Sequence, residues 1–129
     1  YTLRTLFPYT TLFRSPLMKP RDQDKQVQKS TVSVFASTDL DSQLKEAGIK
    51  TVIISGLMTH ACVAGAARDA VPRGYGVVVA SDASATRTIT RDNGDSVSAD
   101  ALHRAALAEI EDTFGDVLTT AQIINLPRH

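Results

Sequence analysis

The sequence predicts an α/β fold built around a parallel sheet. Two continuous apolar runs, at 51–55 and 76–82, are typical of strands, and a helical segment rich in alanine, 62–70, lies between them. A second helical segment, with an apolar stripe, occupies 98–113. Strands that alternate with helices at this spacing form βαβ units, in which the strands are parallel. Because both runs are continuous rather than alternating, we expect strands that are buried on both faces.

A short strand and a helix precede the first of these runs. The strand is expected to end at 27–29. The helix is expected over about 39–47, with Thr38 or Asp39 as its N-cap. Gly48 follows directly, at the position where a helix commonly ends in a left-handed residue.

The C-terminal part continues the alternation of elements. Residues 88–97 are polar, contain Asn93-Gly94, and are expected to form a long surface loop. We expect a last short strand at 116–120 and a terminal turn or strand extension at 121–126. The stripe of the helix at 98–113 that should face the core consists of Leu102, Ala105, Ala106 and Ile110.

Composition excludes several classes of protein. Lys and Arg total 14, as do Asp and Glu, so there is no basic excess that would indicate binding to nucleic acid or to an anionic membrane. No apolar run approaches the roughly 20 residues of a membrane-spanning helix. The 129 residues include one cysteine, which excludes an internal disulfide and a multi-cysteine metal site. A single cysteine suits a reducing compartment, so we expect a cytoplasmic protein.

The first fifteen residues differ from the rest of the chain. The segment 1–15 holds four of the seven aromatic residues, no acidic residue, and the tripeptide Thr-Leu-Phe twice, at 5–7 and 11–13. It lacks the continuous apolar core and the cleavage site of a secretory signal. It resembles translated adapter sequence, so we interpret 1–15 as a non-native extension and 16–129 as the domain. A genuine edge strand or arm is the alternative.

The single cysteine, Cys62, lies at the start of the alanine-rich helix and just beyond the carboxyl end of the strand at 51–55. Unpaired N–H groups and the positive end of the helix dipole favour the thiolate there, which is the nucleophilic form. Ligands of parallel sheets bind beyond the carboxyl ends of the strands. The alternative is a buried structural cysteine, because free cysteine is among the most buried residue types. The placement favours a nucleophile.

Two motifs surround this cysteine, Gly-Leu-Met-Thr-His-Ala-Cys-Val at 56–63 and Ala-Arg-Asp-Ala at 67–70. Lys29 and the segment 33–40 precede them. In this order the motifs resemble those of the isochorismatase-like family of cysteine hydrolases, and the first two are the most specific. The resemblance covers about residues 20–124.

The resemblance implies a Rossmann-like fold of three layers, with six parallel strands between two layers of helices, of which this chain lacks the first strands. It also implies an Asp–Lys–Cys triad, in which Cys62 matches the nucleophile and Lys29 matches the lysine. The family's aspartate lies at the end of the first strand, in an apolar-Asp-x-Gln pattern; we identify no such strand end in this sequence, and Asp22 and Asp24 have the wrong context. The backbone N–H groups of Ala61 and Cys62 would form the oxyanion hole.

The resemblance further suggests which residues surround a substrate. Phe35, Met58 and His60 are expected to line the pocket; the alternatives are core packing for Phe35 and an unrelated surface position for His60. The family often has a non-proline cis bond in the turn that matches Leu57–Met58. His103 is expected at a surface or an interface rather than in catalysis. Some amidases of the family bind zinc through N-terminal residues without a counterpart here, so we expect no metal and no other cofactor.

The function that the resemblance implies is hydrolysis of a small amide or a related C–N compound through a thioester on Cys62. Because the aspartate is missing, we expect little or no activity from this exact chain. The expected partners are a small-molecule substrate and, as for many members of the family, further copies of the chain, without nucleic acid or membrane. The alternatives are a non-catalytic fragment with a structural cysteine and a redox-responsive cysteine protein.

Overall fold

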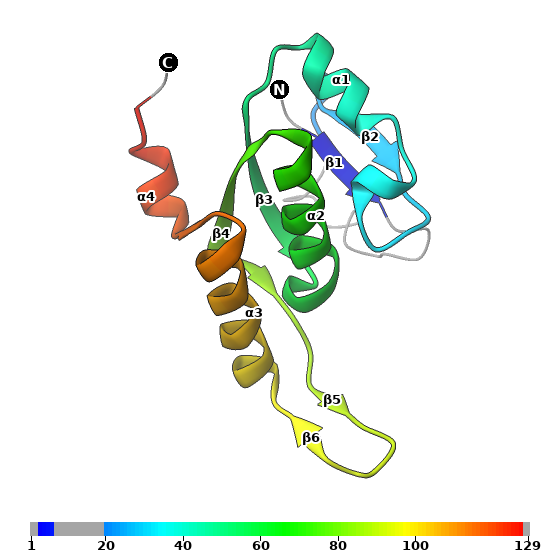
Figure 1. The fold of residues 1–129 in the computed structure, drawn as a ribbon, viewed down its shortest axis with the longest axis vertical. Coiled ribbons are helices and arrows are strands. Elements are labelled where there is room, and N and C mark those ends of the chain that lie inside the picture. The colour runs from blue at the N-terminus through cyan, green and yellow to red at the C-terminus, as the bar shows by residue number, and fades with distance from the viewer. Residues whose placement is uncertain (1–2, 7–19, 128–129) are drawn as a thin grey trace.

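The computed structural model describes residues 3–6 and 20–127, with the side chains of 20–127. Its main sheet confirms the predicted α/β fold, because three parallel strands lie where the apolar runs predict them (Figure 1). In spatial order these strands are β3 (Thr51–Leu57), β4 (Gly76–Ala85) and β7 (Asp116–Leu118).

The two long strands of this sheet differ in burial. In β4, the residues from Val77 to Ala80 are all buried. In β3 the burial alternates: Val52 and Ile54 are half-buried, whereas Ile53 is 58% exposed. The expectation that the strand at 51–55 is buried on both faces is therefore wrong, because Ile53 projects from a face that the described residues leave open to solvent.

Three short elements precede the sheet, namely β2 (Lys25–Gln28), the 3₁₀ turn η3 (Val34–Ala36) and α1 (Leu40–Glu46). The hydroxyl of Thr38 accepts the N–H of Leu40 where α1 begins, and Gly48 follows the helix with φ of 70°. Leu40 and Leu44 are buried in the core. The predicted helix over 39–47 is therefore confirmed.

One described part of the N-terminal segment is a strand, β1 (Leu3–Leu6), which pairs in parallel with β2. The other residues of 1–15 lie outside the described part of the chain. The interpretation of this segment as a non-native extension stays a prediction, because four residues can pair with a strand edge whatever their origin.

The segment after β3 begins as a wide turn and continues as a helix. The turn η4 (Thr59–Val63) has π-helical hydrogen bonds, and α2 (Ala64–Ala70) and the 3₁₀ turn η5 (Val71–Arg73) follow it. The buried apolar residues of this segment are all alanine except one: Val63, Ala64, Ala66, Ala67 and Ala70. Their small side chains let the helix lie close to β3 and β4.

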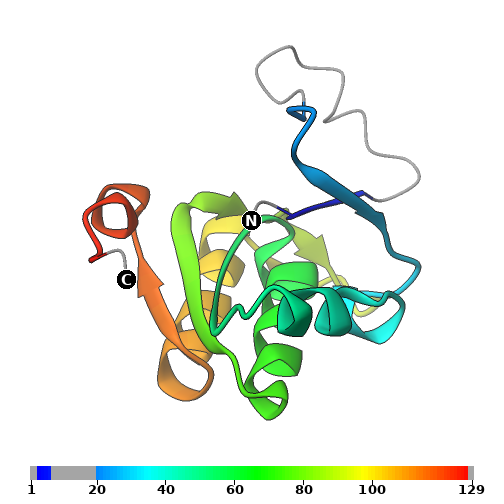
Figure 2. The same ribbon diagram turned by 90° about the horizontal axis from the view of Figure 1, so that it is seen from above.

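The second long helix, α3 (Ala99–Thr113), differs from prediction in its inner face. Ala106 is buried as predicted, but Ala105 is exposed, and the half-buried residues include Leu102 and His103. Because successive residues are about 100° apart around a helix, His103 and Ala105 lie on different faces. In α3 the inner face includes His103 and not Ala105. In Figure 2, α2 and α3 lie side by side.

The segment at 88–97 is a hairpin and not the predicted loop. It consists of β5 (Ile89–Thr90) and β6 (Ser96–Val97), joined through a turn in which Gly94 has φ of 90°. The hydroxyls of Thr90 and Ser96 are 2.8 Å apart and support the pairing. Figure 1 shows this hairpin extending beyond the body of the sheet.

The chain from 120 onward is a helix, α4 (Thr120–Ile124), and not the predicted turn or strand extension. A capping box starts it: the hydroxyl of Thr119 accepts the N–H of Gln122, and the side chain of Gln122 accepts the N–H of Thr119. Asp82, in the C-terminal half of β4, also accepts hydrogen bonds from the N–H and hydroxyl of Thr120. None of the helices among residues 20–127 is long and apolar enough to cross a membrane.

Candidate active site

Cys62 lies in the wide turn η4, directly after the carboxyl end of β3. The peptide bond between Leu57 and Met58 is cis, at the position where the resemblance places such a bond. The carbonyl of Met58 then accepts two N–H groups, from Ala61 at 3.0 Å and from Val63 at 3.2 Å. Cys62 itself is half-buried. The turn thus presents a single thiol at the edge of the sheet where parallel α/β proteins bind ligands.

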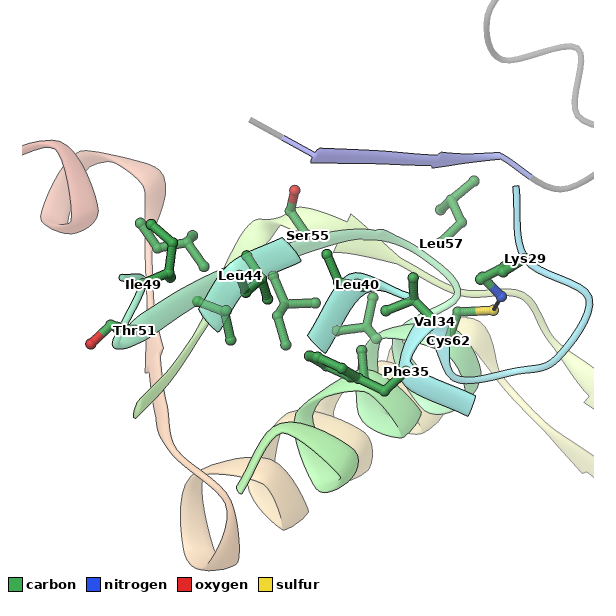
Figure 3. A pocket seen from close by; sticks show the side chains of 15 residues that line it. Lys29, Val34, Phe35, Leu40, Leu44, Ile49, Thr51, Ser55, Leu57 and Cys62 are labelled. Carbon is green, nitrogen blue, oxygen red and sulfur yellow. Dashed lines mark hydrogen bonds between the residues drawn. The ribbon is translucent and has the colours of Figure 1, made fainter. Parts of the chain in front are cut away.

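Lys29 meets this thiol from the segment that follows β2. Its side chain is buried, with 4% of the residue exposed, and its Nζ lies 3.3 Å from the Sγ of Cys62 (Figure 3). The same Nζ donates to the carbonyls of Thr31 at 2.8 Å and Val32 at 2.9 Å. Two carbonyl oxygens therefore orient the side chain of Lys29 toward the sulfur of Cys62.

The loop that supplies these carbonyls is held by its own hydroxyl groups. The Oγ1 of Thr31 donates to the carbonyl of Ser33 at 2.7 Å and lies 2.9 Å from the Oγ of Ser37. The Oγ of Ser37 also accepts the backbone N–H groups of Ser30 and Thr31. The loop is therefore a structured support for the lysine, and the pair joins residues that are 33 positions apart in sequence.

A groove of about 320 Å³ begins at the Lys29–Cys62 pair and follows β3. It is lined by every residue of β3 except Gly56, so it contacts side chains from both faces of the strand and runs along its edge. Figure 3 shows the residues of α1 and η3 on the opposite wall. This wall is mostly apolar and comprises Val34, Phe35, Leu40 and Leu44.

The residues expected to line a substrate pocket lie in different places. Phe35 lines the groove and is 7% exposed. Met58 and His60 are not among the lining residues of this groove. The ring of His60 instead lies against Thr86, with its Nδ1 2.5 Å from the Oγ1 of Thr86, just beyond β4.

The structure also shows a contact that sequence reasoning missed. Thr59, the first residue of η4, is fully buried, and its Oγ1 lies 2.8 Å from the Nδ1 of His103 on α3. The two residues are 44 positions apart, so no local pattern predicts their contact. The nucleophile turn is thus tied to α3 through Thr59 and to the end of β4 through His60.

The structure also shows how the N–H of Ala61, expected in the oxyanion hole, and the carboxylate of Asp24 are bonded. The N–H of Ala61 already donates to the carbonyl of Met58, so it would have to share or exchange that bond to bind an oxyanion. Asp24 is buried and accepts three hydrogen bonds from the backbone and guanidinium of Arg21. Its carboxylate is therefore engaged in the chain's own structure. Among the described residues, no three or more His, Cys, Asp or Glu side chains gather where they could hold a metal.

Comparison with known proteins identifies the family. The protein-family model described as the isochorismatase domain matches residues 15–122, which is most of the chain and includes Lys29 and Cys62. The chain belongs to the isochorismatase family. Members of this family are hydrolases, with amidohydrolases among them.

The similar proteins include both uncharacterised and named hydrolases. The isochorismatase family protein YrdC of Bacillus subtilis is 35% identical over 84% of this chain and 58% of its own length. A ureidoacrylate amidohydrolase of Methylobacterium radiotolerans is 36% identical over 81% of this chain and 36% of its own. The crystal structure of a cysteine hydrolase from Pseudomonas syringae pv. phaseolicola superposes with a TM-score of 0.82 at 35% identity, covering 85% of this chain and 52% of that one. The chain thus spans little more than half the length of several of its relatives.

Proposed function

We propose that the protein from which this chain derives is a cysteine hydrolase that cleaves a small amide or a related C–N compound. The observation that carries the proposal is the contact of 3.3 Å between the Nζ of Lys29 and the Sγ of Cys62. A buried ammonium beside a half-buried thiol is an arrangement that generates a nucleophile. The similarity to an amidohydrolase supports the class of bond that is attacked.

The proposed reaction is an acyl transfer in two steps. The thiolate of Cys62 attacks the carbonyl carbon of the substrate, and collapse of the tetrahedral intermediate breaks the C–N bond, releases the protonated amine and leaves a thioester. Water then attacks the thioester, which releases the acid and restores the thiol. Lys29 stabilises negative charge on sulfur, and the N–H of Cys62, with that of Ala61 once released from Met58, stabilises the oxyanion.

The proton transfers require a base, which the family resemblance assigns to an aspartate in an apolar-Asp-x-Gln pattern. The match to this pattern in the 129 residues, Leu40-Asp41-Ser42-Gln43, lies in the helix α1 and not at the end of a strand. We therefore expect the described pair to form an activated thiol whose complete catalytic cycle needs a further carboxylate. Because much of the groove follows the free edge of β3, an additional strand could pair with β3 there. The substrate would then bind at the end of the groove that holds Cys62.

Alkylation of Cys62 by iodoacetamide between pH 5.5 and 9 tests the proposal in the chain as it exists. We expect the rate to stay high well below pH 8 and to fall about tenfold at pH 6.5 in Lys29→Met, because a hydrogen bond to a charged group is lost. Lys45→Met is the matched control, because Lys45 is an exposed lysine in the last turn of α1 and pairs with Asp41. We also expect no amide turnover that depends on Cys62.

The two contrary outcomes have different meanings. If Cys62 reacts as an ordinary thiol in the folded chain, the activated pair does not exist, and a structural cysteine explains the sequence better. If the unmodified chain hydrolyses amides and Cys62→Ala abolishes that activity, the requirement for a further carboxylate is wrong. Circular dichroism of each variant establishes that the rates compare folded proteins.

A further inference from the structure

A buried hydroxyl, that of Thr59, lies at the start of η4, the turn that carries Cys62. Thr59 has no exposed surface, and the partner of its Oγ1 is the Nδ1 of His103 at 2.8 Å. A buried hydroxyl without a hydrogen-bond partner is strongly destabilising, and the same holds for a buried ring nitrogen. The contact therefore fixes both side chains, and it joins η4 to α3.

The backbone of Thr59 belongs to the hydrogen-bond pattern that places Cys62. The carbonyl of Thr59 accepts the N–H of Ala64, five residues ahead, and the carbonyl of Met58 accepts the N–H of Val63. Such a π-helical turn is wider than an α-helical one and is rare except at functional sites. Any shift of Thr59 would therefore change the path of the turn on which Cys62 lies.

The support on the other side of the contact is rigid. Ala106 and Ile110, three and seven residues after His103, are 5% and 0% exposed and pack α3 against the sheet. A side chain that extends from a helix fixed in this way can hold a reactive group more precisely than a loop residue can. His103 reaches Thr59 from this helix and touches neither Cys62 nor Lys29 by any hydrogen bond of the described residues.

We propose that His103 is a positioning residue for Cys62. It holds Thr59, and through Thr59 the turn η4, in the geometry at which the Sγ of Cys62 lies 3.3 Å from the Nζ of Lys29. The inference rests on the proposed function, because it concerns the reactivity of the same thiol. Its effect is indirect, so loss of the contact should slow Cys62 without abolishing its reaction.

The test compares two amide replacements at one position in the full chain. His103→Asn places an amide where the Nδ1 lies, whereas the amide of His103→Gln corresponds to the other ring nitrogen. We expect alkylation of Cys62 at pH 6.5 to slow about fivefold in His103→Gln and in Thr59→Val, the factor that one hydrogen bond represents. His103→Asn and Thr59→Ser, which keep a partner for the contact, should remain within about twofold of the wild-type rate.

A matched control separates positioning from general destabilisation. Ile110→Val removes one methylene from a buried residue of α3 that lies seven positions after His103, which lowers stability and leaves the Thr59–His103 pair intact. We expect it to leave the alkylation rate and its pH profile unchanged. The double variant Thr59→Val with His103→Gln should be no slower than the slower single variant, because both remove the same bond.

The outcomes distinguish the two proposals. If the wild-type thiol reacts slowly below pH 8, the proposed function fails before the positioning inference is reached, and that inference falls with it. If the wild-type thiol is fast and the Asn and Gln variants react equally, His103 does not position Cys62. If Ile110→Val slows Cys62 as much as His103→Gln does, the effect is one of stability, and the inference is overturned.

Discussion

The strands β3 and β4 have nearly the same amino-acid pattern and very different surroundings. β3 contains Val52-Ile53-Ile54, and β4 contains Val77-Val78-Val79. β4 lies between two neighbours, and Val79 has no exposed surface. β3 is the edge strand of the described sheet, and Ile53 is 58% exposed. A run of apolar residues therefore indicates that a strand is suited to burial, whereas the elements beside the strand decide whether its side chains are buried.

The difference also explains where the groove lies. The apolar edge of β3 faces α1 across a space of about 320 Å³, whereas both edges of β4 are paired, one with β3 and the other with β7. Edge strands with unprotected apolar surface are prone to pair with other strands. The Lys29–Cys62 pair lies at the end of this open edge, so the least complete part of the sheet adjoins the candidate catalytic pair.

The largest expected effect comes from placing a charge in each strand. Val79→Asp would bury an unpaired carboxylate, at about 3–5 kcal/mol, which is a large fraction of the stability of an ordinary domain. Ile53→Asp should change the free energy of unfolding by no more than about 0.5 kcal/mol, because its side chain is open to solvent. Urea denaturation followed by circular dichroism measures both. A large loss in Ile53→Asp would mean that another chain covers β3 in solution.

A smaller effect is expected from two glycines, of which Gly115 adjoins a strand of the sheet and Gly65 adjoins the loop at Val32. A Cβ on Gly115 would lie 2.7 Å from the Cβ of Val77 and closer still to its carbonyl oxygen, so Gly115→Ala should destabilise by about 1–3 kcal/mol. A Cβ on Gly65 would lie 3.1 Å from the Cγ1 of Val32, a residue that is 53% exposed.

Because Val32 has room to move, Gly65→Ala should be neutral or stabilising by up to about 1 kcal/mol through helix propensity. Thermal denaturation of the two alanine variants gives the comparison. Equal destabilisation by both substitutions would show that the segment at Val32 is packed as firmly as the centre of the sheet.

Much of the fold could be predicted from local sequence. The helices at 39–47 and 98–113 and all three strands of the main sheet were expected, because periodicity and caps are local signals. Two misses had local signals as well. The pattern Thr119-Thr-Ala-Gln122 is a capping box that predicts the start of α4, and Asn93-Gly94 is a typical hairpin turn. The exposure of Ile53 had none, since it depends on which elements lie opposite.

The candidate site was less predictable from the residues alone. Placement at a helix start made Cys62 a candidate, but its contact with Lys29 came from a family resemblance, because the pair is 33 residues apart. The inward direction of His103 had a usable signal: it precedes the buried Ala106 and Ile110 by three and seven residues. Its partner Thr59 had no such signal, because only the packing of α3 on η4 brings the two together.

The smallest expected effect concerns a polar contact of Asp82, in the C-terminal half of β4. Hydrogen bonds from the hydroxyl and the backbone N–H of Thr120 hold the pKa of Asp82 below its ordinary value of 3.8. A carboxyl whose pKa is lower in the folded state contributes stability above its unfolded pKa and loses it as the pH falls through the folded pKa. Asp82→Asn should therefore be less stable than the wild type at pH 6, with a difference that shrinks as the pH falls below 3.8.

Urea midpoints of the two proteins at pH 6 and pH 3 measure this difference, with Asp92→Asn in the exposed hairpin as the control. The same difference at both pH values would show that the Asn variant loses packing or cap geometry rather than a charge-dependent bond. A difference confined to the higher pH would show that the C-terminal half of β4 is secured by a charged contact to α4, in addition to its burial. β3 ends instead in the turn of Cys62, where the hydroxyl of Thr59 pairs with the ring of His103 and the ring of His60 pairs with the hydroxyl of Thr86.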